Sequence, residues 1–501
     1  MEIAMRLEII AENKINTVNV NKGDNLLETL TGLGYDINAV CGGNRSCFKC
    51  KVKISYPIPK PSQRETKALA AEEIEAGIRL ACDFILAEDT GVEILSNGKM
   101  EVLQAASQNA NTANTNGKVR AVIDIGTTTL VAALIDENAR VIGTAGEKNK
   151  QAAFGADVIA RVKHVANGGL QELHRVVTVQ LSGMLKNLLD TYKIEKIEDI
   201  TVAGNTAMLH LFFNRDCSGL GFYPYTADFL ASQTINGLAL GLGVDAPVHS
   251  LPCIASFAGA DLTAGIVSEY KDTEKYSLLI DLGTNAEVAL FNGKRILASS
   301  AAAGPAFEGA SIKQGTGAIP GAICSFELVN GNPRVKTIGN KVPVGICGSG
   351  LIDVVAELLK NNIVEDTGYM LTGTSFDICE EVSIYAEDIR ELQLAKAAIA
   401  AAIDMLILSA GLTAEDIDRV LISGGFGSFI NPGNAALIGL FPPELRKKTA
   451  AVGNSSLTGG ILCAAYPEKM ALAENIAAST EYVDLANSVE FAERYVEHMM
   501  F

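Results

Sequence analysis

One short pattern, a run of apolar residues that ends in Asp-x-Gly-Thr, occurs twice in this chain of 501 residues. The copies lie at residues 122–129 and 279–286, and each continues into a second apolar run, at 130–135 or 287–291. Two apolar runs joined by a glycine turn predict a strand–turn–strand hairpin. A repeat this widely spaced predicts two related α/β lobes that open with the same hairpin.

The two turns have the chemistry of a phosphate site. Glycine lets the chain turn without a Cβ atom, so backbone N–H groups can face phosphate oxygens. An aspartate at each strand end, Asp124 or Asp281, can hold Mg²⁺ and orient an attacking water, which makes both candidate catalytic residues. The predicted phosphate-binding residues are Gly126, Thr127, Thr128, Thr129, Gly283, Thr284 and Asn285.

Another glycine turn follows the apolar residues 420–422. Its glycines, Gly424, Gly425 and Gly427, would let an adenine and a ribose lie against the backbone. Alone, such a turn is more often structural, but beside two phosphate hairpins it favours a nucleoside site. The sequence therefore predicts that all three turns serve one nucleotide.

Two other segments leave alternatives open. Asn205 and Thr206 either meet the terminal phosphate or only begin a helix. Glu308 lies in the glycine-rich loop after the second hairpin, together with Ser311 and Gln314. We expect one of these three to position an attacking water or to reach a site on a partner protein, and Glu308 is the catalytic candidate.

Four of the ten cysteines gather near the N-terminus, at Cys41, Cys47, Cys50 and Cys82. Their spacing is close to the plant-type pattern for a [2Fe–2S] cluster held by four thiolates. Structural zinc, the main alternative, usually uses two close cysteine pairs, and only one is present. Asp24 is expected to cap a short helix over 25–33, and the hairpin–helix–loop–strand order around the cysteines resembles a ferredoxin fold. Arg45 and Phe48 stand at loop positions where ferredoxins often carry small residues.

Composition divides the chain and limits its partners. Residues 104–117 have no charge and no hydrophobic periodicity, which predicts a flexible linker. We therefore expect an α+β ferredoxin-type domain at 1–100, a linker at 101–117 and an α/β two-lobed nucleotide-binding domain at 118–501. The net charge of −17 argues against nucleic-acid or anionic-membrane partners. The apolar run 394–412 is broken by charges, which predicts a buried core helix and not a membrane span. Without a leader pattern, a cytoplasmic location is expected.

The two hairpins and the glycine turn together resemble the superfamily of acetate and sugar kinases, heat-shock chaperone ATPases and actin. That resemblance implies ATP bound between two lobes of an actin-like domain. With the N-terminal cysteine domain, the whole chain resembles the reductive activators of corrinoid proteins. Supporting stretches lie at 154–158, 203–206, 303–309 and 345–350.

The resemblance implies a function and its cofactors. It implies ATP-driven reduction of a corrinoid on a methyl-transfer protein from Co(II) to Co(I), one electron at a time. The implied cofactors are a [2Fe–2S] cluster, ATP and Mg²⁺. The implied partners are the corrinoid protein, a low-potential electron donor and a second copy in a homodimer.

Three other functions were weighed against this one. An ATP-driven activator of the 2-hydroxyacyl-CoA dehydratase type carries a [4Fe–4S] cluster inside its ATPase domain, where this sequence has no obvious ligands. A small-molecule kinase with a redox-sensing ferredoxin domain would phosphorylate a metabolite. A chaperone-like nucleotide switch would need a peptide-binding domain, and none is evident in the sequence.

Overall fold

The computed structural model describes residues 5–11, 14–33, 35, 37, 45, 48, 50–95, 117–424, 430–486 and 488–501. They belong to two compact units, Met1–Lys99 with Lys150–Gly168, and Met100–Asn149 with Gly169–Phe501. The sequence did not predict the grouping of residues 150–168 with the N-terminal unit. The linker predicted at 101–117 lies outside the described residues except for Gly117, so the predicted domain boundaries stay a prediction.

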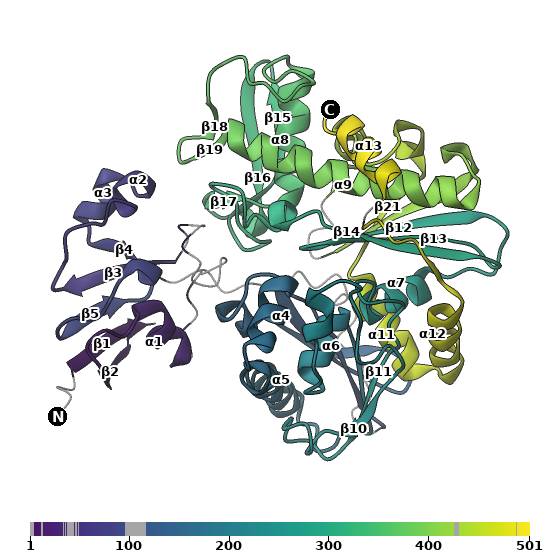
Figure 1. The fold of residues 1–501 in the computed structure, drawn as a ribbon, viewed down its shortest axis with the longest axis horizontal. Helices are drawn as coiled ribbons and strands as arrows, with labels where there is room; N and C mark the ends of the chain where they lie inside the picture. Colours follow the sequence, from purple (N-terminus) through teal and green to yellow (C-terminus); the bar gives the residue numbers. More distant parts are fainter. Residues whose placement is uncertain are drawn as a thin grey trace. The chain divides into compact units, whose positions relative to one another are not determined.

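The first unit is built on a five-stranded sheet (Figure 1). Its strands are β1 (Met5–Ala11), β2 (Lys14–Val20), β3 (Lys51–Tyr56), β4 (Ile78–Leu80) and β5 (Thr90–Glu93). They are ordered β2-β1-β5-β3-β4, and β1 and β5 are parallel while the other neighbours are antiparallel. The predicted N-terminal hairpin is confirmed, because β1 and β2 pair from Met5↔Val20 to Ala11↔Lys14.

Short helices cover this sheet and connect its strands. They are α1 (Leu26–Gly32), α2 (Glu65–Ala68), α3 (Ala71–Glu75) and the 3₁₀ turn η1 (Ala81–Asp83), while residues 150–168 carry η2 (Lys150–Ala153) and α4 (Val158–Ala166). The sequence predicted that Asp24 caps the first helix, and this was wrong. Asn25 accepts the N–H groups of Leu27 and Glu28, whereas Asp24 accepts the N–H of Asn21. Both residue types suit a cap, so local pattern alone did not decide between them.

The second unit contains two six-stranded sheets whose topology matches over five strands, while the sixth strands, β10 and β22, lie at opposite edges. The first sheet has β6 (Arg120–Ile125), β7 (Thr129–Ile135), β8 (Val141–Lys148), β9 (Ile200–Gly204), β10 (Thr234–Asn236) and β11 (Pro247–Ser250), ordered β10-β11-β9-β6-β7-β8. The second has β12 (Tyr276–Leu282), β13 (Ala286–Phe291), β14 (Ile296–Ala301), β20 (Ile417–Ser423), β21 (Thr449–Gly453) and β22 (Glu481–Tyr482), ordered β21-β20-β12-β13-β14-β22.

Each sheet opens with the predicted hairpin. In the first, β6 pairs antiparallel with β7 and parallel with β9; in the second, β12 pairs antiparallel with β13 and parallel with β20. A third antiparallel strand, β8 or β14, and a second parallel strand, β11 or β21, complete the match. The repeated Asp-x-Gly-Thr pattern thus marks two related lobes, as predicted.

Helices fill the space between and around the two sheets (Figure 1). They are α5 (Leu170–Tyr192), α6 (Thr206–Phe212), α7 (Ala260–Glu269), α8 (Gly348–Lys360), α9 (Ala386–Ala410), α10 (Pro432–Leu437), α11 (Ser455–Ala465), α12 (Pro467–Ser479) and α13 (Val489–Glu497). Helices α7 and α11 pack against each other, α11 against β6 and β9, and α7 against β12 and β13. This helix pair therefore lies between the sheets, close to both hairpin turns.

An inserted subdomain and one long helix complete the second lobe. The insertion contains the sheet β16 (Asn332–Thr337), β15 (Ala322–Val329) and β17 (Gly345–Ile346), helix α8, and the hairpin β18 (Ser375–Cys379) and β19 (Val382–Tyr385). Helix α9 is long and apolar enough to cross a membrane by length and composition, but 78% of its apolar window is buried inside the protein. The prediction of a buried core helix near 394–412 is confirmed.

Candidate functional site

Two of the four predicted cluster ligands are described, and both are buried. Cys50 and Cys82 are 1% and 3% exposed, while Cys41 and Cys47 lie outside the described residues. Cys50 precedes β3 and Cys82 lies in η1, and the Ala81 N–H donates to the Cys50 carbonyl at 2.9 Å. The two thiols therefore come from directly adjacent segments, as ligands of one cluster must.

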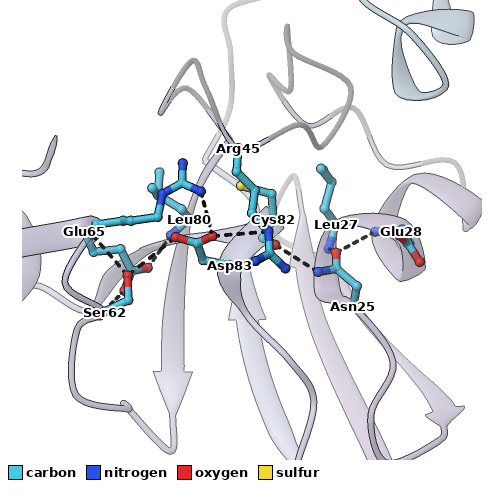
Figure 2. Close-up of polar contacts among 10 residues, drawn as sticks. Asn25, Leu27, Glu28, Arg45, Ser62, Glu65, Leu80, Cys82 and Asp83 are labelled. Carbon is cyan, nitrogen blue, oxygen red and sulfur yellow. Dashed lines mark hydrogen bonds and ion pairs between the residues drawn. The ribbon is translucent and has the colours of Figure 1, made fainter. Parts of the chain in front are cut away.

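The backbone around Cys82 is fixed by buried polar side chains (Figure 2). Asn25 Nδ2 donates to the Cys82 carbonyl at 2.9 Å. Glu65, which is 3% exposed, accepts the Leu80 N–H through Oε1 and the Ser62 N–H through Oε2, both at 2.7 Å. Charge-assisted bonds of this length hold a backbone firmly, so the segment that presents Cys82 is preorganised.

In the second unit, each hairpin turn is closed by one backbone hydrogen bond. The Gly126 N–H donates to the Thr129 carbonyl at 3.0 Å, and the Gly283 N–H donates to the Asn285 carbonyl at 2.9 Å. A Cβ atom on Gly126 would lie 2.6 Å from that carbonyl oxygen, so only glycine fits there. Thr127, the next residue, is partly buried within the same turn.

The two turns face each other across the lobes. The hydroxyl oxygens of Thr128 and Thr284 are 3.4 Å apart, although the residues come from different sheets. Between them lies the carboxylate of Glu308, the last residue of η4 (Pro305–Glu308). Its Oε2 atom accepts from Thr128 Oγ1 at 2.9 Å and from Thr284 Oγ1 at 2.7 Å. An anionic oxygen thus occupies the meeting point of the two predicted phosphate turns.

Asp124 is held at the end of β6 by two residues that the sequence reading missed. Asn454 Nδ2 donates to Asp124 Oδ2, and Ser456 Oγ donates to Asp124 Oδ1, both at 2.8 Å. Burial raises the pKa of Asp124, and these two hydrogen bonds oppose the rise. Asn454 caps α11 through the Leu457 N–H, so the helix between the sheets also orients the first aspartate.

Three more carboxylates lie near one another beside Asp124. Burial, and then the negative charge of Asp124, raise the pKa of Asp281 to about 6. Burial also raises the pKa of Asp261, at the start of α7, and the charge of Asp281 adds to the rise. The pKa of Glu287, on β13, is raised by burial and then by Asp261. The sequence reading missed Asp261 and Glu287, although Glu287 follows the second turn directly.

A divalent cation fits this group of carboxylates through water and phosphate. Within the residues that the structure describes, no group of three or more His, Cys, Asp or Glu could hold a metal ion alone. Mg²⁺ usually keeps several waters and binds through one or two carboxylates plus substrate phosphates. Burial raises the pKa values of all four acids, and repulsion from neighbouring carboxylates adds to the rise for Asp261, Asp281 and Glu287, which matches that mode of binding.

Asn205 and Thr206 begin a helix, which was one of their two predicted roles. Asn205 Oδ1 accepts the Ala207 N–H at 3.0 Å and so caps α6. Thr206 is fully buried and its hydroxyl donates to the Ala255 carbonyl at 2.8 Å. A Cβ on Gly259 would touch the backbone of both residues, so this turn packs tightly on the start of α7. Phosphate contact by Asn205 or Thr206 stays a prediction.

The third glycine turn is described only at its first residue. Gly424 has φ +121° and its N–H donates to the Gly453 carbonyl at 3.1 Å. A Cβ atom there would overlap the carbonyl oxygen of Leu282, the residue before Gly283. The third turn therefore lies against the second hairpin. Gly425 and Gly427 fall outside the described residues.

The helical pattern around Asp353 predicts that this residue faces solvent or caps a helix, and the structure shows that this prediction is wrong. It is 3% exposed and accepts from Asn434 Nδ2 at 2.7 Å. Helix α8 packs against β15, α10 and η4, so a polar residue in its middle is enclosed. With Glu357 and Lys360, Asp353 lines a cavity of about 210 Å³ between α8, β15 and α10.

Comparison with protein families accounts for nearly the whole chain. The model for the C-terminal domain of RACo, the ASKHA domain, matches residues 275–501, and the RACo middle region matches 120–272. The model for the 2Fe-2S iron-sulfur cluster binding domain matches residues 9–87. These matches confirm the predicted fold class, a ferredoxin-type domain followed by a two-lobed domain of the actin and sugar-kinase type.

Individual relatives agree with the family models. The corrinoid activation enzyme RamQ of Eubacterium limosum is 30% identical over 413 residues, covering 75% of this chain and 69% of the relative. The [Co(II) methylated amine-specific corrinoid protein] reductase of Methanosarcina barkeri is 27% identical, covering 67% and 68%. The solved structure of a reductive activator for corrinoid, iron-sulfur protein superposes with a TM-score of 0.70 at 27% identity, covering 99% and 98%.

Proposed function

The chain belongs to the family of reductive activators of corrinoid proteins, and on that premise we propose that it uses ATP to drive the one-electron reduction of Co(II) to Co(I) on a corrinoid protein. One observation carries the proposal. Thr128 and Thr284, from two related lobes, meet at 3.4 Å in a chain that also presents buried cysteines with ferredoxin spacing. A nucleotide site and an electron-transfer site in one chain are what ATP-driven electron transfer requires.

The N-terminal unit would supply the electron. Cys41, Cys47, Cys50 and Cys82 would hold a [2Fe–2S] cluster, and the adjacency and burial of the two described thiols support this. When bound, such a cluster accepts one electron from a low-potential donor and passes it on. The protein's contribution is to exclude water and fix the ligands, as Asn25 does for Cys82.

The two-lobed unit would bind and hydrolyse ATP. Backbone N–H groups and threonine hydroxyls of both turns would face the phosphates, while Asp124 and Asp281 would hold Mg²⁺ through water. Glu308 is the predicted residue that positions the attacking water, since it already lies between the turns. Hydrolysis then gives ADP and phosphate, and the lobes no longer share a γ-phosphate.

ATP is needed because the electron moves uphill. Each ~59 mV of unfavourable potential costs a factor of about ten in a one-electron equilibrium. ATP can offset this only by binding one arrangement of the protein or its complex more tightly than another. We also propose that the protein is cytoplasmic, has no nucleic-acid or membrane partner, and forms a homodimer.

An anaerobic visible spectrum tests this function. The reconstituted, pre-reduced protein is mixed with a Co(II) corrinoid protein, and Mg-ATP is added midway. We expect the Co(I) band to rise only after ATP, and not with a non-hydrolysable analogue. If several corrinoid proteins stay Co(II) although the cluster spectrum and ATP turnover are sound, the corrinoid function is refuted and a redox-sensing kinase becomes the better explanation.

A further inference from the structure

Two residues in the predicted cluster loop have a backbone conformation that favours glycine. Arg45 has φ 60° and Phe48 has φ 56°, both in the left-handed region. They are the two positions at which the sequence departs from the small residues of most ferredoxins. Side chains other than glycine are strained there, so the loop needs contacts that hold it in place.

One buried carboxylate outside the loop supplies such a contact to Arg45. Asp83 follows the predicted ligand Cys82, and its side chain is 7% exposed. Arg45 Nε lies 3.5 Å from Asp83 Oδ1 (Figure 2). Arg64 Nη1 lies 3.6 Å from the same oxygen. A carboxylate this buried needs compensating charge, unlike the partners of an exposed ion pair.

Arg64 connects the second strained residue to the same group. Its guanidinium carbon lies 5.3 Å from the centre of the Phe48 ring, in the geometry of a cation–π contact. Arg64 therefore contacts both Phe48 and Asp83, and Asp83 contacts both arginines. Arg45 and Phe48, the two described residues of the loop, thus each contact a member of the Asp83–Arg64 pair.

We propose that Asp83 and Arg64 are positioning residues that clamp the cysteine loop in its strained conformation at Arg45 and Phe48. The proposal rests on the proposed cluster, because its purpose is to keep the loop cysteines in register with Cys82. The clamp also places a carboxylate beside that cysteine. It explains how this chain carries two large residues where glycine would cost less.

The test compares Asp83→Asn in two backgrounds. In the wild-type background we expect iron release to a chelator to accelerate at least about tenfold, since the isosteric amide loses both charge contacts. In the Arg45→Gly, Phe48→Gly background the same substitution should change the release rate less than about twofold, because glycines need no clamp. Asp83→Glu should restore slow release.

A second readout is the reduction potential of the cluster in the fraction of protein that keeps its iron. Removing a negative charge beside the cluster favours the reduced state, so Asp83→Asn should raise the potential while Asp83→Glu leaves it near wild type. The matched control is Asp89→Asn, an exposed aspartate of the same unit that pairs with Arg6. It should change neither readout.

The outcomes separate the clamp from the cluster itself. Equal acceleration by Asp83→Asn in both backgrounds, or none in either, would overturn the clamp, and so would a potential that never moves. A wild-type chain that takes up no [2Fe–2S] cluster would refute the cluster assignment, and the clamp with it. Neither readout needs ATP or a corrinoid protein, so failure of the clamp leaves the proposed function standing.

Discussion

Replacement of Glu308 by glutamine tests the nucleotide site most directly. The Glu308 carboxylate accepts from both Thr128 and Thr284, the hydroxyls assigned to phosphate. A phosphate that takes those hydroxyls must displace an anionic oxygen already bonded to them. Glu308→Gln keeps the shape and one acceptor oxygen but removes the competing charge.

The magnitude follows from the two hydrogen bonds. A hydrogen bond to a charged group contributes about 1.5–3 kcal/mol and a neutral one about 0.5–1.5 kcal/mol, so each loses about 1 kcal/mol on substitution. Together the two weaker bonds lower the cost of displacing the Glu308 side chain by about 2 kcal/mol, which corresponds to about thirtyfold tighter binding of the nucleotide. We expect the opposite effect on turnover, because Glu308 is also the predicted water-positioning residue.

Calorimetric binding of a non-hydrolysable ATP analogue, with and without Mg²⁺, measures this effect. The expected result for Glu308→Gln is tighter binding in both conditions together with slower ATP hydrolysis. Glu380→Gln, an exposed carboxylate between β18 and β19, is the matched control and should change neither. Unchanged or weaker binding without Mg²⁺ would refute the competition, and weaker binding only with Mg²⁺ would make Glu308 a ligand of the metal.

Three further predictions concern other parts of the chain. Burial raises the pKa of Asp281 to about 6, so the protonated acid favours the folded protein and its contribution to stability falls as pH rises from about 4 to about 6. Mg²⁺ with the ATP analogue should therefore raise the melting temperature more at about pH 8 than at about pH 5. An equal rise at both pH values would contradict this. Gly424→Ala should lower the free energy of unfolding by ~2 kcal/mol or more and weaken analogue binding, because the added Cβ meets the Leu282 carbonyl. Gly331 also has a positive φ but lies in open space, so Gly331→Ala measures the cost of the backbone conformation alone in the same denaturant unfolding experiment. Shortening residues 104–117 should slow corrinoid reduction without slowing ATP hydrolysis. Replacing the same residues by a Gly/Ser segment of equal length should leave both rates unchanged. An unchanged reduction rate in the shortened variant would rule out a role for linker length.

Sequence reasoning succeeded where the signal was local. The hairpins at Asp124 and Asp281 are pairs of apolar runs around a glycine turn, and their strand pairing follows from neighbouring residues. The cysteine spacing is also a local pattern, and the match of residues 9–87 to a cluster-binding domain agrees with the prediction made from it. What the pattern left undetermined was the order of parallel strands, since β9 and β20 arrive from distant parts of the chain.

The missed residues share a different cause. Asn454 and Ser456 look like ordinary helix-start residues, and only the fold brings them to Asp124. The error at Asp353 has the same origin, because the helical pattern did not show that β15, α10 and η4 would pack around α8. Long-range packing, which no local periodicity encodes, decided each of these positions.

The four acids around the hairpin turns have a consequence for how the site works. Burial raises the pKa values of Asp124, Asp281, Asp261 and Glu287, and repulsion between carboxylates adds to the rise for the last three. Ionisation of all four acids is therefore unfavourable without a cation. Among the ion pairs of the described residues, none joins Lys or Arg to any of the four. If Mg²⁺ arrives with ATP as proposed, it would supply the missing positive charge and displace protons as it binds. We therefore predict that nucleotide affinity and local proton binding are linked, and that the site binds the magnesium complex of ATP in preference to free phosphate.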